Sequence, residues 1–223
     1  GGLRLACNEQ RWKEVLRQTT TAHSFGLEME LLSPKEAQEL WPIMDIEDVY
    51  GAAFLPTDGQ ANPTDITQAL AKGARNKGAK IIEETKALRV ILENDVIKGL
   101  ETDKGTISCE KIVCCGGQWT RQFAETVGVN VPLVSFQHQY LVTEEIDGVN
   151  SDLPTLRDPD RLIYFKEEVG GLVMGGYEPN PLSWAEKSVP EDFHFSLLDS
   201  NYEHFELIMN NALGRVPLLE TAG

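Results

Sequence analysis

The sequence is poor in basic residues and lacks any long apolar run. Only 20 lysines and arginines stand against 35 aspartates and glutamates, so the formal charge is −15 over 223 residues. Binding to nucleic acid or to an anionic membrane needs basic patches, and this charge argues against both as partners. No run approaches the roughly 18 apolar residues of a membrane span, and no signal peptide is visible.

Motifs that identify several enzyme classes are missing as well. The chain has no G-x-G-x-x-G or Walker A motif for nucleotide phosphates, and no G-x-S-x-G turn for a serine nucleophile. Its four histidines and four cysteines contain neither an H-x-x-x-H nor a C-x-x-C spacing. We therefore predict no metal site.

The cysteines give little sign of disulfide bonding. Cys114 and Cys115 are adjacent in a run that is expected to form a buried strand, which is a poor geometry for structural bridges. This predicts a reduced, intracellular protein. With 223 residues, 41% of them hydrophobic, the chain can form one large domain or two small ones around a substantial core.

The first part of the chain alternates between helix and loop signals. Residues 8–28 have apolar positions at helical spacing, and Ser33-Pro34-Lys35-Glu36 is a capping box that opens a short helix. Residues 44–63 are expected to form a long loop, because glycine and proline are frequent there. Asn62 then caps another helix, which ends at Gly78.

Strand patterns follow this helix. We expect a strand over 79–84 and a β-meander over 88–109. Ile112–Cys115 has four apolar residues in a row, which is typical of a strand buried on both faces. Gly116-Gly117 and a helix containing Trp119 come next. A strand, a glycine turn and a helix bring backbone close to a ligand, so the turn and Trp119 are candidate ligand contacts.

Longer strands are expected after Pro132. Residues 134–142 alternate between two faces, 162–177 have the signature of a hairpin, and 191–211 form an amphipathic helical stretch. Gly175-Gly176, inside the second hairpin strand, indicate that another group approaches the backbone closely.

His138 and Tyr164 are the candidates for chemistry in this part. An imidazole titrates near pH 6.5 and can act as a base or donor, but a histidine in a strand is commonly a packed core residue. Tyr164 is equally compatible with an ordinary sheet aromatic. The residues alone thus indicate a mixed α/β protein, compatible with a cofactor enzyme whose phosphate-binding start is missing.

The order and spacing of several short segments resemble the dimethylglycine and sarcosine dehydrogenase group, flavin-dependent amine dehydrogenases of the D-amino-acid-oxidase-like superfamily. The resemblance covers the whole chain. The segments that carry it are Gly2-Leu3-Arg4-Leu5-Ala6, Leu32-Ser33-Pro34-Lys35-Glu36-Ala37, Pro56-Thr57-Asp58-Gly59, Phe136-Gln137-His138-Gln139-Tyr140, Leu156-Arg157-Asp158-Pro159-Asp160, Gly175-Gly176-Tyr177-Glu178 and Arg215-Val216-Pro217.

The resemblance implies a fold class and a domain division. It implies an α/β (mixed α+β) chain with part of a Rossmann-like FAD-binding domain over 1–131, including a helical insert, and an antiparallel-sheet substrate domain with a helix over 132–223. FAD would lie at the junction of the two domains. The family's N-terminal βαβ unit, its flavin-attachment segment and its C-terminal folate-binding domain have no counterpart here. The chain is therefore expected to be an internal fragment that is inactive alone and does not hold FAD tightly.

The resemblance also implies site residues. Gly116 and Gly117 correspond to a second FAD-contacting segment, in which Cys114 and Cys115 take alanine positions. Ala87 would meet the adenine side of FAD, and Trp119 is a further candidate contact. His138 and Tyr164 would lie by the flavin ring and hold or deprotonate the amine.

The implied activity is oxidation of an N-methylated amino acid such as sarcosine or dimethylglycine, with hydride transfer to FAD. A one-carbon unit would pass to tetrahydrofolate through the folate domain, and electrons could leave to an acceptor protein. The compartment would be the mitochondrial matrix in a eukaryote and the cytoplasm in a bacterium. Two alternatives are a non-catalytic relative, similar to a pyruvate dehydrogenase phosphatase regulatory subunit, and an α/β interaction domain.

Overall fold

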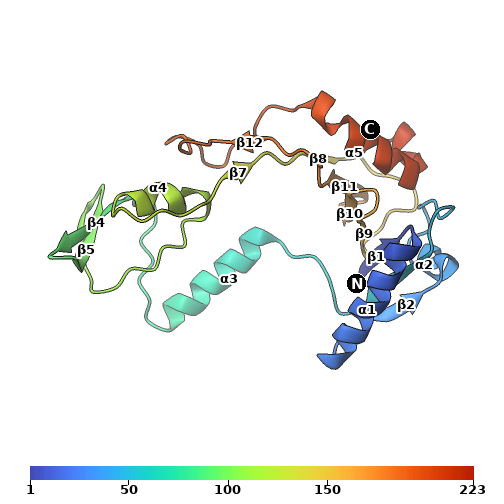
Figure 1. The fold of residues 1–223 in the computed structure, drawn as a ribbon, viewed down its shortest axis with the longest axis horizontal. Coiled ribbons are helices and arrows are strands. Elements are labelled where there is room, and N and C mark those ends of the chain that lie inside the picture. The colour runs from blue at the N-terminus through green and yellow to red at the C-terminus, as the bar shows by residue number, and fades with distance from the viewer. The chain divides into compact units, whose positions relative to one another are not determined.

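The computed structural model describes residues 1–223, and the chain divides into two compact units. Unit 1 comprises Gly1–Ala61, His138–Pro181 and Asp199–Gly223, and unit 2 comprises Asn62–Gln137 and Leu182–Leu198. Figure 1 shows the elements of each unit along the colour-coded chain. Each unit is assembled from separated segments of the chain. The two units therefore do not coincide with the predicted domains 1–131 and 132–223. The assignment of cofactor and substrate domains stays a prediction.

The main element of unit 1 is a seven-stranded mixed sheet with the order β2-β3-β1-β9-β10-β11-β8. Only the β1–β9 pair is parallel. The strands are β1 (Gly2–Ala6), β2 (Glu30–Leu32), β3 (Gly51–Leu55), β8 (Tyr140–Val142), β9 (Thr155–Asp158), β10 (Ile163–Glu168) and β11 (Gly171–Gly176). The predicted hairpin is confirmed as β10–β11.

Strand β3 corrects the prediction of a loop over 44–63. It lies between β2 and β1 in the sheet, and its first three residues, Gly51, Ala52 and Ala53, are all buried. A strand made of such small buried residues has no alternation of polar and apolar side chains, so its pattern is not recognisable in the sequence.

The three α-helices of unit 1 begin at side-chain caps, whereas its 3₁₀ helix has none. The helices are α1 (Glu9–Ser24), α2 (Pro34–Leu40), α5 (Tyr202–Arg215) and the 3₁₀ helix η2 (Pro217–Thr221). Helix α2 has the predicted capping box of Ser33 and Glu36. Helix α5 is shorter than the predicted stretch over 191–211, because the Asn201 side chain accepts a hydrogen bond from the His204 N–H and the helix starts only there.

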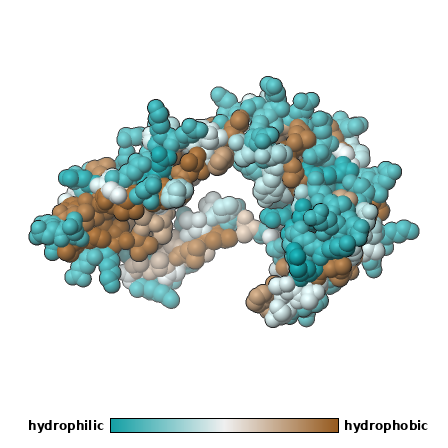
Figure 2. All heavy atoms as spheres, viewed as in Figure 1, coloured by the Kyte–Doolittle hydropathy of each residue, from teal (hydrophilic) through white to brown (hydrophobic).

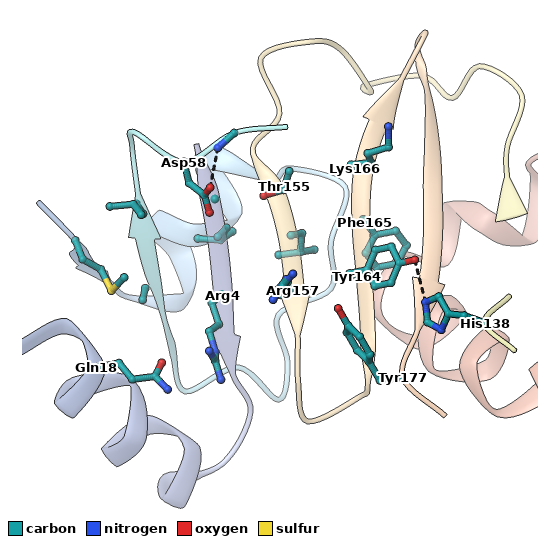
Figure 3. Close-up of a pocket in the computed structure, with 17 residues that line it drawn as sticks. Arg4, Gln18, Asp58, His138, Thr155, Arg157, Tyr164, Phe165, Lys166 and Tyr177 are labelled. Carbon is teal, nitrogen blue, oxygen red and sulfur yellow. Dashed lines mark hydrogen bonds between the residues drawn. The ribbon is translucent and has the colours of Figure 1, made fainter. Parts of the chain in front are cut away.

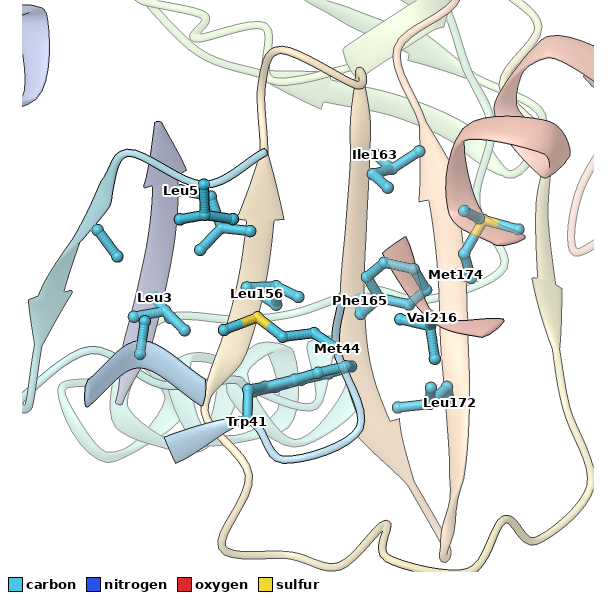
Figure 4. Packing of buried hydrophobic residues seen from close by; sticks show 14 of the residues in the cluster. Leu3, Leu5, Trp41, Met44, Leu156, Ile163, Phe165, Leu172, Met174 and Val216 are labelled. Carbon is cyan, nitrogen blue, oxygen red and sulfur yellow. The ribbon is translucent and has the colours of Figure 1, made fainter. Parts of the chain in front are cut away.

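One face of the unit 1 sheet carries the hydrophobic core (Figure 4). Leu5, Leu156 and Phe165 come from three neighbouring strands and are at most 1% exposed. Trp41 covers them, and its indole N–H donates a 2.9 Å hydrogen bond to the Pro154 carbonyl. Since successive strand residues point to opposite faces, the residues between these core positions are directed to the other face of the sheet.

Unit 2 combines helices with two small sheets. Its elements are α3 (Pro63–Asn76), β4 (Ala87–Glu93), β5 (Val96–Thr102), β6 (Gly105–Ser108), the 3₁₀ helix η1 (Gly117–Trp119), α4 (Thr120–Glu125), β7 (Ser135–Phe136) and β12 (Ser183–Trp184). The β4–β5–β6 sheet confirms the predicted meander. Unit 2 exposes many apolar side chains (Figure 2), among them Leu70, Leu92 and Val96.

Three strand predictions in this part of the chain are wrong. Residues 79–84 and Ile112–Cys115 form no strand, and Val113 is 85% exposed. A buried strand needs neighbours on both edges and on both faces, and no strand pairs with Ile112–Cys115 in this structure. The expected strand over 134–142 is divided into β7, which pairs with β12, and β8, which pairs with β11.

No helix is long and apolar enough to cross a membrane.

Candidate active site

The face of the unit 1 sheet opposite the core carries one row of residues across four strands. Gly175 on β11 pairs with Tyr164 on β10, which pairs with Arg157 on β9, which pairs with Arg4 on β1. Directly opposed residues on neighbouring strands have Cβ atoms about 4.5–5.5 Å apart. The register therefore places an aromatic side chain beside two guanidinium groups on one surface.

Side chains approach Gly175 and Gly176 closely, one from each face of the sheet, and leave no space for a Cβ atom at either position. A Cβ atom at Gly175 would lie 2.5 Å from Cζ of Tyr164, and one at Gly176 would lie 2.5 Å from Cδ1 of Ile208 on α5. The expectation that a group approaches the backbone here is confirmed. The groups are the Tyr164 ring on one face and the core residue Ile208 on the other.

The structure brings His138 and Tyr164 together (Figure 3). His138 Nε2 lies 3.3 Å from the Tyr164 hydroxyl, and the two rings are roughly parallel with centroids 6.2 Å apart. Tyr177 is the third ring of the cluster, with its centroid 5.8 Å from His138 and 5.7 Å from Tyr164. Three rings at this spacing form an aromatic wall that can face a cationic or methylated group.

Glu178 completes this cluster on the other side of the imidazole. Its carboxylate lies 3.5 Å from His138 Nδ1, and its side chain is only 5% exposed. Burial raises the pKa of Tyr164, and the neighbouring Tyr177 and Glu178 raise it further. The Tyr164 hydroxyl can donate to His138 Nε2 in the imidazole tautomer that carries its proton on Nδ1, toward Glu178.

Sequence reasoning missed Tyr177 and Glu178 as site residues. A signal was present, since both follow Gly175-Gly176 directly at the end of a hairpin strand. Their side chains reach the imidazole because β11 pairs with β8, with Gly175 opposite Tyr140, and His138 lies just before β8.

A cavity of about 550 Å³ opens beside this row, a size typical of small-molecule sites. Figure 3 shows His138, Tyr164 and Tyr177 on one side and Arg4 and Gln18 on the other. The polar, charged and aromatic side chains of its lining are Arg4, Gln18, Asp58, His138, Thr155, Arg157, Tyr164, Phe165, Lys166 and Tyr177.

The candidate cofactor contacts lie in unit 2. Ala87 at the start of β4 and Trp119 at the end of η1 line one hollow of about 280 Å³, together with Phe123 on α4. Gly117 has a φ of +54°, and a Cβ there would have nothing within 4 Å. Gly116 and Gly117 are exposed and lead into η1. The structure thus brings Ala87 and Trp119 together. The glycine turn lies just before Trp119 in the chain.

A cluster of Cys7, Asp158 and Asp160 has ligand atoms within 4.8 Å of one another. Both carboxylates already have cationic partners, because Arg215 contacts Asp158 at 2.8 Å and Arg11 contacts Asp160 at 3.1 Å. Burial and the nearby Asp158 raise the pKa of the Cys7 thiol from 9.0 to about 12. A protonated thiol is a poor metal ligand, so this cluster is a structural ion-pair network.

The chain and its fold have counterparts among known proteins. The family model described as FAD dependent oxidoreductase matches residues 1–222, and the chain belongs to this family.

Among individual relatives, human mitochondrial sarcosine dehydrogenase is 36% identical over all of this chain, which spans 24% of that protein. The 4-methylaminobutanoate oxidase (formaldehyde-forming) of Paenarthrobacter nicotinovorans is 36% identical, with all of this chain and 27% of that protein covered. The mouse pyruvate dehydrogenase phosphatase regulatory subunit is 32% identical over 99% of this chain and 25% of that protein. The chain thus spans about a quarter of the length of these relatives.

A solved structure of similar fold is the L-proline dehydrogenase from P. horikoshii. Its TM-score is 0.83 at 26% identity, with 99% of this chain and 56% of that chain covered. The mixed α/β fold predicted for an FAD-dependent oxidoreductase is confirmed.

The residues present fit an FAD cofactor. The hollow beside Ala87 and Trp119 is lined largely by aliphatic and aromatic groups, and its charged members Lys86 and Glu191 pair with each other at 3.3 Å. An uncharged, partly aromatic surface suits a planar heterocycle. In unit 1, the ring of Tyr164 and the side chain of Arg157 offer stacking and cationic groups in one cavity.

Proposed function

We propose that this chain contributes the amine-oxidising site of an FAD-dependent oxidoreductase whose substrate is an N-methylated amino acid such as sarcosine or dimethylglycine. The observation that carries the proposal is the 3.3 Å contact between His138 and Tyr164 on the wall of a substrate-sized cavity. The names of the two most identical relatives described above support the substrate class.

His138 and Tyr164 are assigned to the amine. An amino acid in solution carries a protonated amine, which has no lone pair to assist loss of hydride. The Tyr164 oxygen accepts that proton as its own hydroxyl proton passes to His138 Nε2, and the two groups then hold the neutral nitrogen in place. Glu178, 3.5 Å from Nδ1, stabilises the imidazolium that forms. The bound FAD would supply the hydride acceptor for the carbon next to nitrogen.

The third ring of the cluster would cover one side of the bound amine. Tyr177 packs against both His138 and Tyr164, so the amine would sit against aromatic carbon rather than solvent. The iminium product must meet water, or a one-carbon acceptor, only after the hydride has left.

The FAD contacts are assigned to unit 2. Ala87 and Trp119 are proposed to contact the dinucleotide through their shared hollow, and Gly116 and Gly117 through an approachable backbone. Transfer of the one-carbon unit to tetrahydrofolate, electron transfer to an acceptor protein and a matrix location in a eukaryote are proposals for the full-length protein.

The test uses a full-length protein that carries this chain together with its flavin-binding segment. Sarcosine and dimethylglycine are added without oxygen, and bleaching of the flavin absorbance is followed. We expect His138→Ala to slow bleaching about 10²- to 10⁴-fold, the usual contribution of a positioned acid–base group. His194→Ala is the matched control, because His194 is an exposed histidine outside the cavity.

Two results would count against the proposal. Bleaching in His138→Ala within a few-fold of the unaltered protein would remove the role of this residue. Absence of bleaching with any secondary or tertiary amine would favour a regulatory protein, as the relative that regulates pyruvate dehydrogenase phosphatase suggests.

A further inference from the structure

Three aromatic rings line the cavity of unit 1 without being packed into the core. They belong to His138, Tyr164 and Tyr177 (Figure 3). Tyr177 is 53% exposed, and the His138 side chain is 41% exposed. An aromatic ring that lies open on a cavity wall offers its electron-rich face to a ligand.

The rings form two walls that are inclined to each other. His138 and Tyr164 are joined at their edges by the 3.3 Å contact of Nε2 with the hydroxyl, and their planes differ by only 21°, so they make one continuous wall. Tyr177 is inclined to these two rings by 35° and 54° and makes the second wall. With centroids 5.7, 5.8 and 6.2 Å apart, a single cation over this triangle meets all three rings within the roughly 6 Å range of cation–π attraction.

A buried acid lies behind the first wall. The Glu178 carboxylate is 3.5 Å from Nδ1 of His138, and its side chain is only 5% exposed. A negative charge at this position attracts a cation held on the rings, and burial limits its screening by water. Aromatic rings backed by a carboxylate are suited to a permanent cation that forms no hydrogen bond.

The basic residues of the cavity lie away from this acid and from Tyr177. Lys166 is paired with Glu168 at 2.6 Å. Arg157 and Arg4 are on β9 and β1, whereas Tyr177 follows β11, on the other side of β10. A cation on the Tyr177 side of the cavity is therefore separated from these guanidinium groups by at least one strand.

We propose that the three rings of His138, Tyr164 and Tyr177 bind a quaternary methylammonium group, and that a compound carrying it inhibits the protein reversibly. A quaternary nitrogen spreads its charge over its methyl groups, which is the kind of cation that aromatic cages recognise. It has no proton to give to the Tyr164 oxygen and no lone pair to assist loss of hydride. It therefore occupies the site without reacting.

This inference rests on the proposed function, because the inhibitor takes the place assigned to the amine. A fully methylated relative of the substrate competes with the substrate for the rings. The rate of amine oxidation then depends on the ratio of quaternary to tertiary or secondary amine, a form of control that needs no second site.

The test compares two probes of the same shape. Choline carries a quaternary nitrogen, and 3,3-dimethyl-1-butanol has a carbon atom in its place; neither contains a carboxylate. Dissociation constants are measured by calorimetry on the full-length flavin-loaded protein. We expect choline to bind at least about 10-fold more tightly, the sum of three cation–π contacts at an open site. Equal affinities would refute the proposal, because shape alone would then explain binding.

Tyr177→Leu removes one ring and keeps an apolar side chain. It should weaken choline by about 2- to 30-fold, the range of one cation–π contact, and leave 3,3-dimethyl-1-butanol nearly unchanged. Tyr177→Phe keeps the ring and should keep the affinity for choline. Tyr202→Leu is the matched control, since Tyr202 is an exposed tyrosine of α5 outside the cavity.

Three results with these variants would overturn the proposal. Equal losses for both probes in Tyr177→Leu would show that only packing is lost. A loss of choline binding in Tyr177→Phe would assign binding to the hydroxyl and not to the ring. A loss in Tyr202→Leu as large as that in Tyr177→Leu would show that the effect is not local.

Kinetics separate this inference from the proposed function. We expect choline to raise the KM for sarcosine without changing kcat and to leave the flavin unbleached on its own; bleaching by choline would refute the dead-end complex. A protein that oxidises no amine but binds choline more tightly than the neutral alcohol retains the ring site and loses the chemistry. One that oxidises sarcosine but does not distinguish the two probes retains the chemistry and loses the inference.

Discussion

The ring of Tyr164 lies against Gly175 on the neighbouring strand, where any side chain would occupy the same space. This glycine lets the phenol lie close to the sheet, within reach of His138. At the residue scale, the orientation of His138 and Tyr164 thus depends on the absence of a Cβ atom at residue 175. The functional importance of Gly175 comes from a packing requirement and not from a contact with substrate.

The Cys7 thiol makes the stability of the folded chain depend on pH. Its pKa is raised from 9.0 to about 12, chiefly by burial and then by Asp158. Between these two pH values the unfolded chain has released the thiol proton while the folded chain retains it, so stability falls as pH rises through this window. We expect the unfolding free energy of the unaltered chain to fall more steeply from pH 9 upward than that of Cys7→Ser.

Thiol labelling supplies an independent measurement on the same residue. Cys114 and Cys115 are exposed and should react with a disulfide reagent at pH 8 before unfolding, whereas Cys7 should react only after it. Labelling of Cys7 as fast as that of Cys114 in the folded chain would contradict the burial argument.

At the element scale, one buried side chain fixes the C-terminal end of α5 to strand β9 and to the loop before β3. Arg215 is fully buried and lies 2.8 Å from both Asp158, at the end of β9, and Asp48. It also hydrogen-bonds to the Asp45 carbonyl. This network fixes the helix that places Ile208 against Gly176, and so supports the strand that ends at the site.

We expect Arg215→Met to lower the unfolding free energy by about 3–5 kcal/mol, because Asp158 would be left as a buried charge without its partner. Arg75→Met is the control, since Arg75 and Glu83 form an exposed pair worth about 0–1 kcal/mol. Urea unfolding measures both variants. A similar small change in the two would show that the buried network contributes little.

Elements with strong local signals were predictable from the sequence. Helix α2 has its capping box and proline, and the β10–β11 hairpin has an apolar run on each side of a glycine turn. Strand β3 and the break between β7 and β8 were not predictable, because strand pairing depends on residues far away in the chain. The run of apolar residues at 112–115 predicted a buried strand. A strand is buried, however, only where neighbouring strands pair with it.

The candidate site was predictable only in part, for the same reason. His138 and Tyr164 followed from a family resemblance, and their contact stands in the structure. Arg157 and Arg4 became candidates only through the parallel pairing of β1 with β9, which joins residues more than 150 positions apart. No local pattern encodes that pairing.

At the scale of the whole molecule, the two units differ in how completely they are packed. Of the buried hydrophobic residues, only Val189 belongs to unit 2, and α3 has no buried residue. The apolar face of α3 and the run at 112–115 are left exposed. Unit 2 is therefore expected to be the less stable part of this chain.

This difference leads to a prediction about the 223-residue chain itself. We expect it to be purified without tightly bound flavin, because it contains no G-x-G-x-x-G segment to hold the pyrophosphate. The measurement is the visible absorbance of the purified chain after addition of FAD and gel filtration. Flavin that co-elutes in stoichiometric amount would overturn the prediction and would indicate that the contacts around Ala87 and Trp119 suffice.

The interleaved construction of unit 1 has a consequence for how the protein is made. Strand β1 lies at the start of the chain, its parallel partner β9 follows more than 150 residues later, and Arg215 and Val216 complete the same core near the end. During synthesis β1 must remain without its parallel partner until the residues between β1 and β9 have been translated. Contacts between such distant residues form slowly and leave apolar strands exposed in the meantime. On the ribosome, the sheet that carries the site can therefore be completed only after β11 has emerged, and its core only after α5 has followed.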